Sequence, residues 1–485
     1  MSNFSLDDGM GPNKWKMALQ HCWPFLLGGF VFFFWTMDHP FFWDTVLLAS
    51  KQAHFYYDHS FQHLLLPLAI DAGHPPFFGL YLALWWSLFS KTLWISHLAM
   101  LPILLGIIWQ VYRLCRFIFT DSKSLFWGML LMLTDATLLA QCSMVSPDLI
   151  LIFAALLGIN SIWYGQKQYL VLATIALSLS SIRGLFTLPA LFVWSLLFSY
   201  TQTSRLTVLE IGKSVLPFIP VTLVVVLYYT FHFWETGWWI STPNEGWSAH
   251  RELTSFSGFV RNIGILAWRL IDFGRIGFWL VLPFLAGLIL RRLWQGESKM
   301  RLLLALPLLL LCFQAPSLLL IQNPIAHRYL MPVLLCFTLL IVYAIHQKKA
   351  WEKWKKGLLW GLLLVQLSGH FWIYPEGVAQ GWDASLAHVP YFELRQKMID
   401  YLEEEGIPLE SVGTEFPNNV ALTYVDLSPS VAAFASKNFA EQTYLFYSNV
   451  FNDFSDEELK MLREDWEQVV EFEQNRIKVS LHRKP

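Results

Sequence analysis

Acidic, histidine and arginine side chains gather in a few short segments of an otherwise apolar chain. The densest segment, residues 37–92, holds Asp38, His39, Asp44, His54, Asp58, His59, His63, Asp71 and His74. A carboxylate beside a bilayer could accept a proton as a general base, and arginine binds phosphate through two parallel hydrogen bonds. We therefore take Asp44 and Asp148 as candidate catalytic acids and Arg183 and Arg328 as candidate phosphate ligands.

Each of these residues also has a structural interpretation. Asp44 precedes a helical pattern over residues 45–57, where a carboxylate is favoured by the helix dipole, and Ser146-Pro147-Asp148 is a plausible helix cap. Arg183 and Arg328 could pair with one of the acids rather than with a ligand. No histidine spacing places two ligands on one predicted helix face, so we predict no metal site and no cofactor; a divalent metal has no support in the sequence.

Composition shows what must hold these residues in place. Of the 485 residues, 55% are hydrophobic and 14% charged, against about 25% charged in soluble proteins. This excludes an ordinary soluble protein and, because charges are few and aromatics many, a disordered one. Residues 375–485 carry 20 acidic and 9 basic side chains, whereas residues 1–374 carry 16 and 25. We predict a membrane region over residues 1–374 and a soluble domain over residues 375–485.

Apolar runs predict eleven membrane-spanning helices. They lie at residues 19–36, 93–112, 126–142, 149–164, 169–182, 185–202, 213–233, 277–290, 302–321, 329–345 and 357–374. The aromatic run at residues 77–89 is too short to span, and we predict that it lies along the surface. This choice puts 17 basic residues in the inner loops and 8 in the outer ones, as the positive-inside rule requires.

In this topology the N-terminus is cytoplasmic and the unusual polar residues lie on the outer face. That face receives the loop of residues 37–92, the turn around Asp148, Arg183, the loop of residues 235–276 and the turn before Arg328. The C-terminal domain lies there too, with predicted helices at residues 391–404 and 456–470, the second capped by Ser455, and strands near residues 411–413 and 474–482. Short inner loops are typical of a bacterial inner membrane protein.

The order of these motifs resembles the GT-C membrane glycosyltransferases, in particular the protein O-mannosyltransferase and aminoarabinose transferase branch (glycosyltransferase families 39 and 83). The motifs, in chain order, are Trp43-Asp44-Thr45, Asp71-Ala72-Gly73-His74-Pro75-Pro76, Ser146-Pro147-Asp148, Arg183-Gly184 and His327-Arg328-Tyr329. The resemblance implies a helical membrane fold with a small C-terminal α+β domain. It departs from the family at Thr45, where a second acid usually stands.

The resemblance also implies an activity. It would be the transfer, with inversion, of a sugar from a polyprenyl phosphate to a protein, lipid or glycan acceptor at the outer face. Asp44 would be the catalytic base and Asp148 the second acid, while the remaining motif residues would bind substrate: His74, Pro75, Pro76, Arg183, Arg328 and Tyr329. The alternative is a polytopic lipid or sugar transporter or flippase, which would place charges in mid-membrane, where this chain has almost none. Nothing indicates a nucleic-acid partner.

Overall fold

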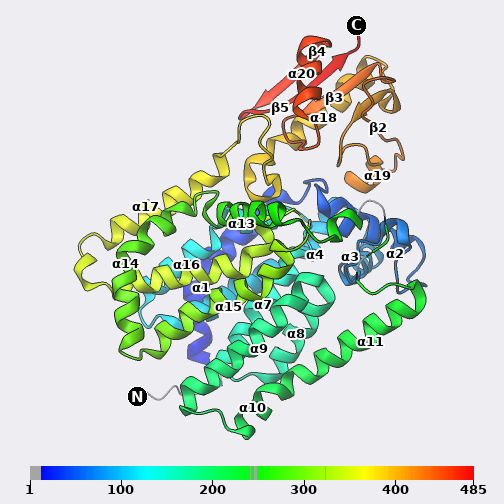
Figure 1. Ribbon diagram of the computed structural model, residues 1–485. Coiled ribbons are helices and arrows are strands. Elements are labelled where there is room, and N and C mark those ends of the chain that lie inside the picture. Colours follow the sequence, from blue (N-terminus) through cyan, green and yellow to red (C-terminus); the bar gives the residue numbers. More distant parts are fainter. Residues whose placement is uncertain (1–11, 241, 245–247, 323) are drawn as a thin grey trace.

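The computed structural model describes residues 12–240, 242–244, 248–322 and 324–485. It is a bundle of helices with a small α+β domain at one end. In Figure 1 the helices run broadly from lower left to upper right, with the N-terminal end of α1 at the lower left and the C-terminal domain at the top. Both parts of the predicted fold class, the multi-helical apolar region and the C-terminal α+β domain, are therefore confirmed.

Seven helical stretches of the described chain are long and apolar enough to cross a membrane, which makes this an integral membrane protein. They contain α1 (Pro12–Thr36), α4 (Leu93–Ile118), α9 (Ile182–Thr203), α10 (Val208–Val215) continuing into α11 (Ile219–Thr236), α14 (Ile276–Trp294), α15 (Ser298–Leu319) and α16 (Met331–Gln347). An eighth candidate is the pair α5 (Ser122–Leu133) and α6 (Ala136–Cys142), bent by 64°.

The other three predicted spans are also helices, but shorter ones. They are α7 (Asp148–Trp163), α8 (Lys167–Ser180) and α17 (Lys355–Ser368), of 16, 14 and 14 residues. At 1.5 Å per residue, a helix of 14 residues is about 21 Å long, less than a hydrocarbon core. Thirteen residues of α7 are buried, so its ends contact protein and not lipid. A helix enclosed in this way does not need the full bilayer length.

The loop of residues 37–92 folds into a compact layer at the end of the bundle that contacts the C-terminal domain. Helical backbone begins at Asp44, continues as a π-helix over Val46–Lys51 and ends as α2 (Gln52–Asp58), as predicted. The aromatic run forms α3 (Phe77–Leu88), which at about 18 Å is too short to span. The apolar side of residues 45–57 faces protein: Val46, Ala49 and Ala53 are fully buried, and α2 packs on α3.

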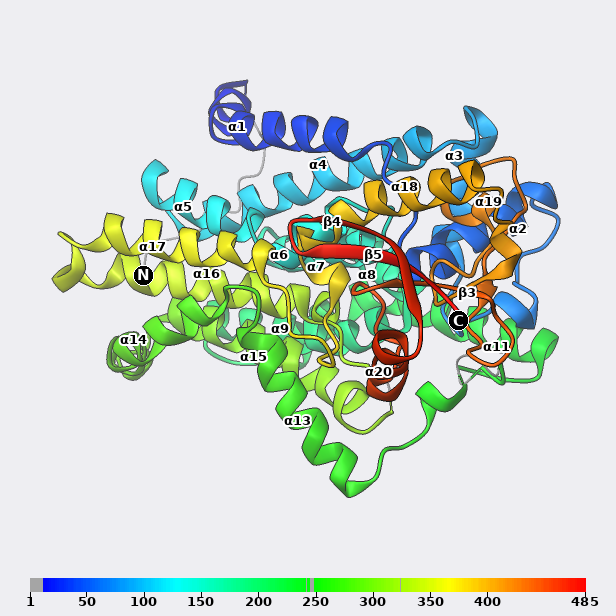
Figure 2. The same cartoon turned by 90° about the horizontal axis from the view of Figure 1, so that it is seen from above.

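The loop of residues 235–276 holds a helix that the apolar runs did not reveal. This is α13 (Phe256–Ile271), which has one polar and one apolar side. It projects from one side of the bundle when the molecule is seen from above (Figure 2). Beside it, the helix α16 runs through the centre of the bundle with 14 of its 17 residues buried. A short 3-10 turn, His327–Leu330, leads into α16 and carries Arg328.

The C-terminal domain is a five-stranded mixed sheet with helices around it. The strands are β1 (Val412–Thr414), β2 (Ala435–Ser436), β3 (Tyr444–Ser448), β4 (Glu467–Gln474) and β5 (Ile477–Arg483), in the order β2-β1-β3-β5-β4. The helices are α18 (Pro390–Glu404), α19 (Leu422–Val425) and α20 (Asp456–Glu464). Figure 2, from above, shows this domain lying over the middle and one side of the bundle.

One prediction for this domain is wrong beyond Glu464. The predicted helix at residues 456–470 starts as expected, with a Ser455–Glu458 capping box, but ends at Glu464. Residues 467–474 form β4, because their alternating side chains pair with β5 through a two-residue turn. Asn475 and Arg476 have φ of 53° and 66°, the left-handed values that such tight hairpins need.

The segment between α17 and α18 attaches the domain to the bundle. Its 3-10 turn Trp382–Ala384 packs on α6, where the amide of Gln141 donates to the Asp383 carbonyl at 2.8 Å and Thr137 Oγ1 donates to the Ala384 carbonyl at 3.0 Å. The ring of His388 also stacks on Phe42, two residues before Asp44, at 4.7 Å. These contacts hold the start of the domain beside the candidate catalytic loop.

Candidate active site

Three helices of the bundle begin at the same place and bring the predicted residues together. Asp148 is the first residue of α7, Arg183 the second of α9, and Arg328 lies in the turn that begins α16. Helix N-termini carry partial positive charge and free backbone N–H groups. The three helix ends and the two arginines make the potential at this end of the bundle positive. The carboxylates of Asp44, Asp148 and Asp383 balance it.

Arg328 is the centre of the cluster. Its side chain is 9% exposed, and its guanidinium makes ion pairs with three carboxylates: Nη2 with Asp44, Nε with Asp148 at 2.9 Å, and Nη1 with Asp383. A buried guanidinium is stable only when its donors have acceptors, and here each of its three nitrogens faces one. The three acids come from the first loop, the start of α7 and the C-terminal segment, so Arg328 joins three separate parts of the chain.

Asp148 lies between the two arginines. Its Oδ2 pairs with Arg328, and its Oδ1 is 2.8 Å from Arg183 Nη2. The side chain is 6% exposed. With both oxygens engaged by cations, Asp148 is poorly suited to accept a proton and well suited to hold the two guanidinium groups at a fixed spacing. Its geometry thus favours a positioning role over the catalytic role expected from the sequence.

Asp44 is the most accessible acid of the cluster. Its side chain is 33% exposed, compared with 6% for Asp148 and 11% for Asp383. One of its oxygens pairs with Arg328, and the residue lines a cavity. The backbone delivers it there by an unusual route: Trp43 has φ of 48°, and the following turn is a π-helix, a distortion often found at functional sites.

The cavity has a volume of about 250 Å³ and a lining of both polar and apolar side chains. The charged, imidazole and phenol groups of the lining are those of Asp44, His74, Arg183, His250, Arg251 and Tyr329. Its apolar side chains are those of Leu48, Ile182, Phe186, Ile240, Leu318 and Ile321. Small-molecule sites typically combine a largely apolar lining with a few polar groups that fix orientation. A ligand with a charged head and a hydrocarbon body matches this lining.

Two cationic groups at this cavity have unused hydrogen-bond donors. Arg183 Nη1 and Arg251 Nε are buried and have no hydrogen-bond partner among the described residues. Arg251 Nη2 donates to the Ala72 carbonyl at 2.8 Å, and the described residues offer Arg251 no carboxylate. The Tyr329 ring lies 4.1 Å from the Arg183 guanidinium carbon and steadies that side chain. Leaving a buried donor unpaired costs free energy, and an anion bound beside Arg183 and Arg251 would remove that cost.

His74 and the two prolines have different positions. His74 lines the cavity, and its Nδ1 accepts the backbone N–H of Ile182 at 3.3 Å, which joins the first loop to α9. Burial and three nearby guanidinium groups, led by Arg251, hold the pKa of His74 well below its usual 6.5, so the ring is neutral. Pro75 and Pro76 are buried outside the cavity lining, and Pro76 caps α3. Their place is structural.

Thr45, which follows Asp44 directly, has a structural part in the turn. Its hydroxyl donates to the Phe42 carbonyl and accepts the Phe42 N–H, both at 2.8 Å, and so closes the turn that presents Asp44. The additional acid at the cluster is Asp383, which is distant in sequence. It was not among the site residues predicted from the sequence, because no local pattern distinguishes it.

Arg251 is the other site residue that sequence reasoning missed. A basic residue in a loop predicted to be outer opposes the general charge bias of the chain, and this was the one available signal. The segment that carries Arg251 reaches the cavity by pairing with the end of α15: the Thr254 N–H donates to the Leu320 carbonyl, and Leu253 forms a bridge with Ile321. Within the described residues, no group of three or more metal-binding side chains has metal-site geometry.

A buried network next to Arg328 fixes the turn that carries it. The His327 Nε2 lies 2.9 Å from Asp272, and the Tyr374 hydroxyl donates to the same carboxylate oxygen. Phe273 N–H satisfies the other oxygen at 2.8 Å. Tyr374 belongs to the segment after α17. The 327–330 turn is therefore held between the end of α13 and the segment after α17.

Comparisons with known proteins yield one structural likeness to report. No protein-family model matches the chain, and no curated protein matches it. Among solved structures, the crystal structure of ArnT from Cupriavidus metallidurans bound to undecaprenyl phosphate is similar, with a TM-score of 0.47 and 14% sequence identity over 80% of this chain and 73% of that one. At this level of similarity, the reaction of this chain has to be argued from its own residues.

Proposed function

We propose that the protein is an inverting glycosyltransferase that moves a sugar from a polyprenyl-phosphate donor to an acceptor at the outer face of a bacterial inner membrane. The observation that carries this proposal is a cavity lined by Asp44, by two incompletely bonded arginines and by apolar side chains. A prenyl phosphate likewise combines an anionic head with a hydrocarbon chain. Arginine is the preferred partner for its phosphate.

In this mechanism the arginines act on the leaving group. As the bond between the anomeric carbon and the phosphate oxygen breaks, negative charge grows on the phosphate. The unused N–H groups of Arg183 and Arg251 would donate to it, and preorganised donors of this kind stabilise the transition state. Arg328, whose donors are already taken by three acids, would act mainly by fixing Asp44 and Asp148 in place.

Asp44 would serve the acceptor. Its exposed carboxylate could accept the proton of an acceptor hydroxyl, or orient an acceptor phosphate, as the new glycosidic bond forms on the face opposite the leaving phosphate. One of its oxygens stays on Arg328, which keeps the other in a defined orientation. The neutral ring of His74 adds no positive charge that would compete for the donor phosphate.

A direct test combines genetics with lipid chemistry. A strain lacking the protein should lose one sugar from a surface glycolipid, glycan or glycoprotein and accumulate its prenyl-linked precursor, both measurable by mass spectrometry. Complementation with the natural chain should restore the sugar, and complementation with Asp44→Asn should not. Unchanged glycans together with lost movement of a lipid or sugar across the membrane would instead identify a transporter.

A further inference from the structure

A second hollow lies at the opposite end of α16 from Arg328. It has a volume of about 730 Å³ and lies between the α4–α5 turn and the segment that joins α16 to α17. The span that begins at His327 ends at Gln347 after 21 residues, or about 30 Å, so the two sites are separated by most of a bilayer. This hollow has no part in the proposed transfer reaction.

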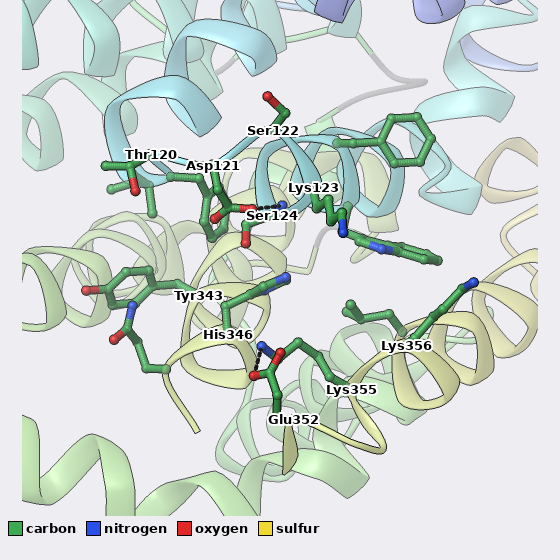
Figure 3. Close-up of a pocket in the computed structure, with 16 residues that line it drawn as sticks. Thr120, Asp121, Ser122, Lys123, Ser124, Tyr343, His346, Glu352, Lys355 and Lys356 are labelled. Atoms are coloured by element: carbon green, nitrogen blue, oxygen red, sulfur yellow. Dashed lines mark hydrogen bonds and ion pairs between the residues drawn. The ribbon is translucent and has the colours of Figure 1, made fainter. Parts of the chain in front are cut away.

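Its rim is basic. Figure 3 shows Lys123 on one side and Lys355 and Lys356 on the other, facing a common space. Lys355 is paired with Glu352 at 2.6 Å. In the described part of the chain, neither Lys123 nor Lys356 has an ion-pair partner. Two lysines that face one hollow without an ion-pair partner repel each other, and an anion between them would relieve that repulsion.

The acidic groups at the rim are already engaged. Asp121 caps α5 by accepting the Ser124 N–H at 2.8 Å, and Glu352 accepts from Lys355. The ring of His346 also faces the space, with its Nδ1 on the Val342 carbonyl of its own helix. The Val342 carbonyl can only accept, so His346 Nδ1 carries the ring proton and is already used. The groups left to donate to phosphate oxygens are therefore the two lysines.

The hollow is bordered by helices whose outer sides are apolar and exposed. Phe126 on α5 is 41% exposed, and Trp360 and Leu364 on α17 are 47% and 64% exposed. Trp127 packs edge-on against Trp360, with ring centroids 5.2 Å apart. Exposed tryptophan beside lysine is typical of the membrane interface. A molecule held here by its anionic head would have its hydrocarbon chains against these two helices.

We propose that this hollow binds the headgroup of an anionic phospholipid of the cytoplasmic leaflet. The basic turn that follows α16 carries Lys348, Lys349 and Lys353, so the positive-inside rule assigns this end to the cytoplasm. Basic pockets between membrane helices on that side suit acidic headgroups. A soluble phosphate compound would meet the lysines equally well but would leave the aromatic border unused, which is why the lipid is preferred.

Native mass spectrometry of the full-length protein in detergent, with phosphatidylglycerol or phosphatidylcholine added, tests the proposal. The natural chain should retain phosphatidylglycerol in preference to phosphatidylcholine. The double variant Lys123→Gln/Lys356→Gln should weaken that binding by roughly 30-fold, since each lysine near an anionic lipid contributes a factor of about five. Lys123→Arg/Lys356→Arg keeps both charges and should bind nearly as the natural chain does.

The matched control is Lys349→Gln/Lys353→Gln, which removes two exposed lysines from the same turn without touching the hollow. It should leave the lipid preference unchanged. An equal loss in both glutamine pairs would show general charge attraction and overturn the site. Displacement of the lipid by inorganic phosphate, or equal thermal stabilisation by phosphate alone, would show a soluble ligand and overturn the lipid assignment. These readouts do not depend on the transferase reaction.

Discussion

Asp383 and Arg328 form an ion pair that joins the entrance of the C-terminal domain to the centre of the candidate active site. Arg328 lies at the start of the most enclosed of the seven candidate membrane spans in the described chain, whereas Asp383 belongs to the segment that leads into the sheet domain. The placement of that domain and the geometry of the cavity are therefore linked through one guanidinium group. This relationship gives the first prediction.

Asp383→Asn should reduce transfer at least tenfold while leaving donor binding nearly unchanged. The amide keeps the size of the side chain but removes its charge, so Arg328 keeps two carboxylates and shifts toward them, and small displacements of reacting groups are costly. Loss of a buried charge partner should also lower the free energy of unfolding by about 1–3 kcal/mol. The measurements are kcat, donor affinity and thermal unfolding. Asp400→Asn, on the exposed side of α18, is the control; equal behaviour of the two variants would refute the coupling.

Asp44→Asn should lower kcat by about 10² to 10⁴, the range for loss of a general base. Donor binding should persist, because Arg183 and Arg251 are unaffected. The comparison variant is Asp58→Asn in the same loop. The Asp58 side chain is 55% exposed, and its ion pair with Lys91 is long, at 3.9 Å. A substantial rate in Asp44→Asn would mean that another group activates the acceptor.

Sequence reasoning located the elements that rest on a local signal. Apolar runs predicted helices at all eleven segments, and charges that opposed the general bias pointed to Asp148, Arg183 and Arg328, which the structure brings together. It failed where position depends on distant partners. The α13 helix is amphipathic and has no apolar run, and β4 is a strand because β5 lies beside it.

The two site residues that it missed have the same cause. Asp383 reaches Arg328 because its neighbours bond to α6, and Arg251 reaches the cavity because its segment pairs with the end of α15. Such tertiary contacts have no periodicity along the chain. The sequence also could not distinguish Asp44 from Asp148 by role; only the pairing of both Asp148 oxygens does so.

His74→Asn should make the protein less sensitive to acid. The folded-state pKa of His74 lies well below 6.5, so below about pH 6.5 the unfolded chain binds a proton that the folded chain does not. Stability contributed by the neutral ring is thus complete above that pH and is lost as the pH falls toward the folded-state pKa. Asparagine can still accept the Ile182 N–H but does not titrate. The melting temperature should fall less between about pH 7.5 and about pH 5.5 in the variant than in the natural chain. An equal fall in both proteins would show that other histidines dominate the acid sensitivity.

Arg251→Gln should weaken binding of the sugar donor more than it lowers kcat. Glutamine can still donate to the Ala72 carbonyl, but it removes the cation and the unused Nε donor at the cavity. A hydrogen bond to a charged group contributes about 1.5–3 kcal/mol, so the KM for the donor and the Kd for polyprenyl phosphate itself should both rise about 10- to 100-fold. The Kd is the decisive measurement, because it requires no turnover and no knowledge of the sugar. Arg261→Gln on the exposed side of α13 should leave that Kd unchanged, since Arg261 lies outside the cavity lining. If Arg251→Gln bound polyprenyl phosphate as tightly as the natural chain, the phosphate in the cavity would have to be held by Arg183 alone.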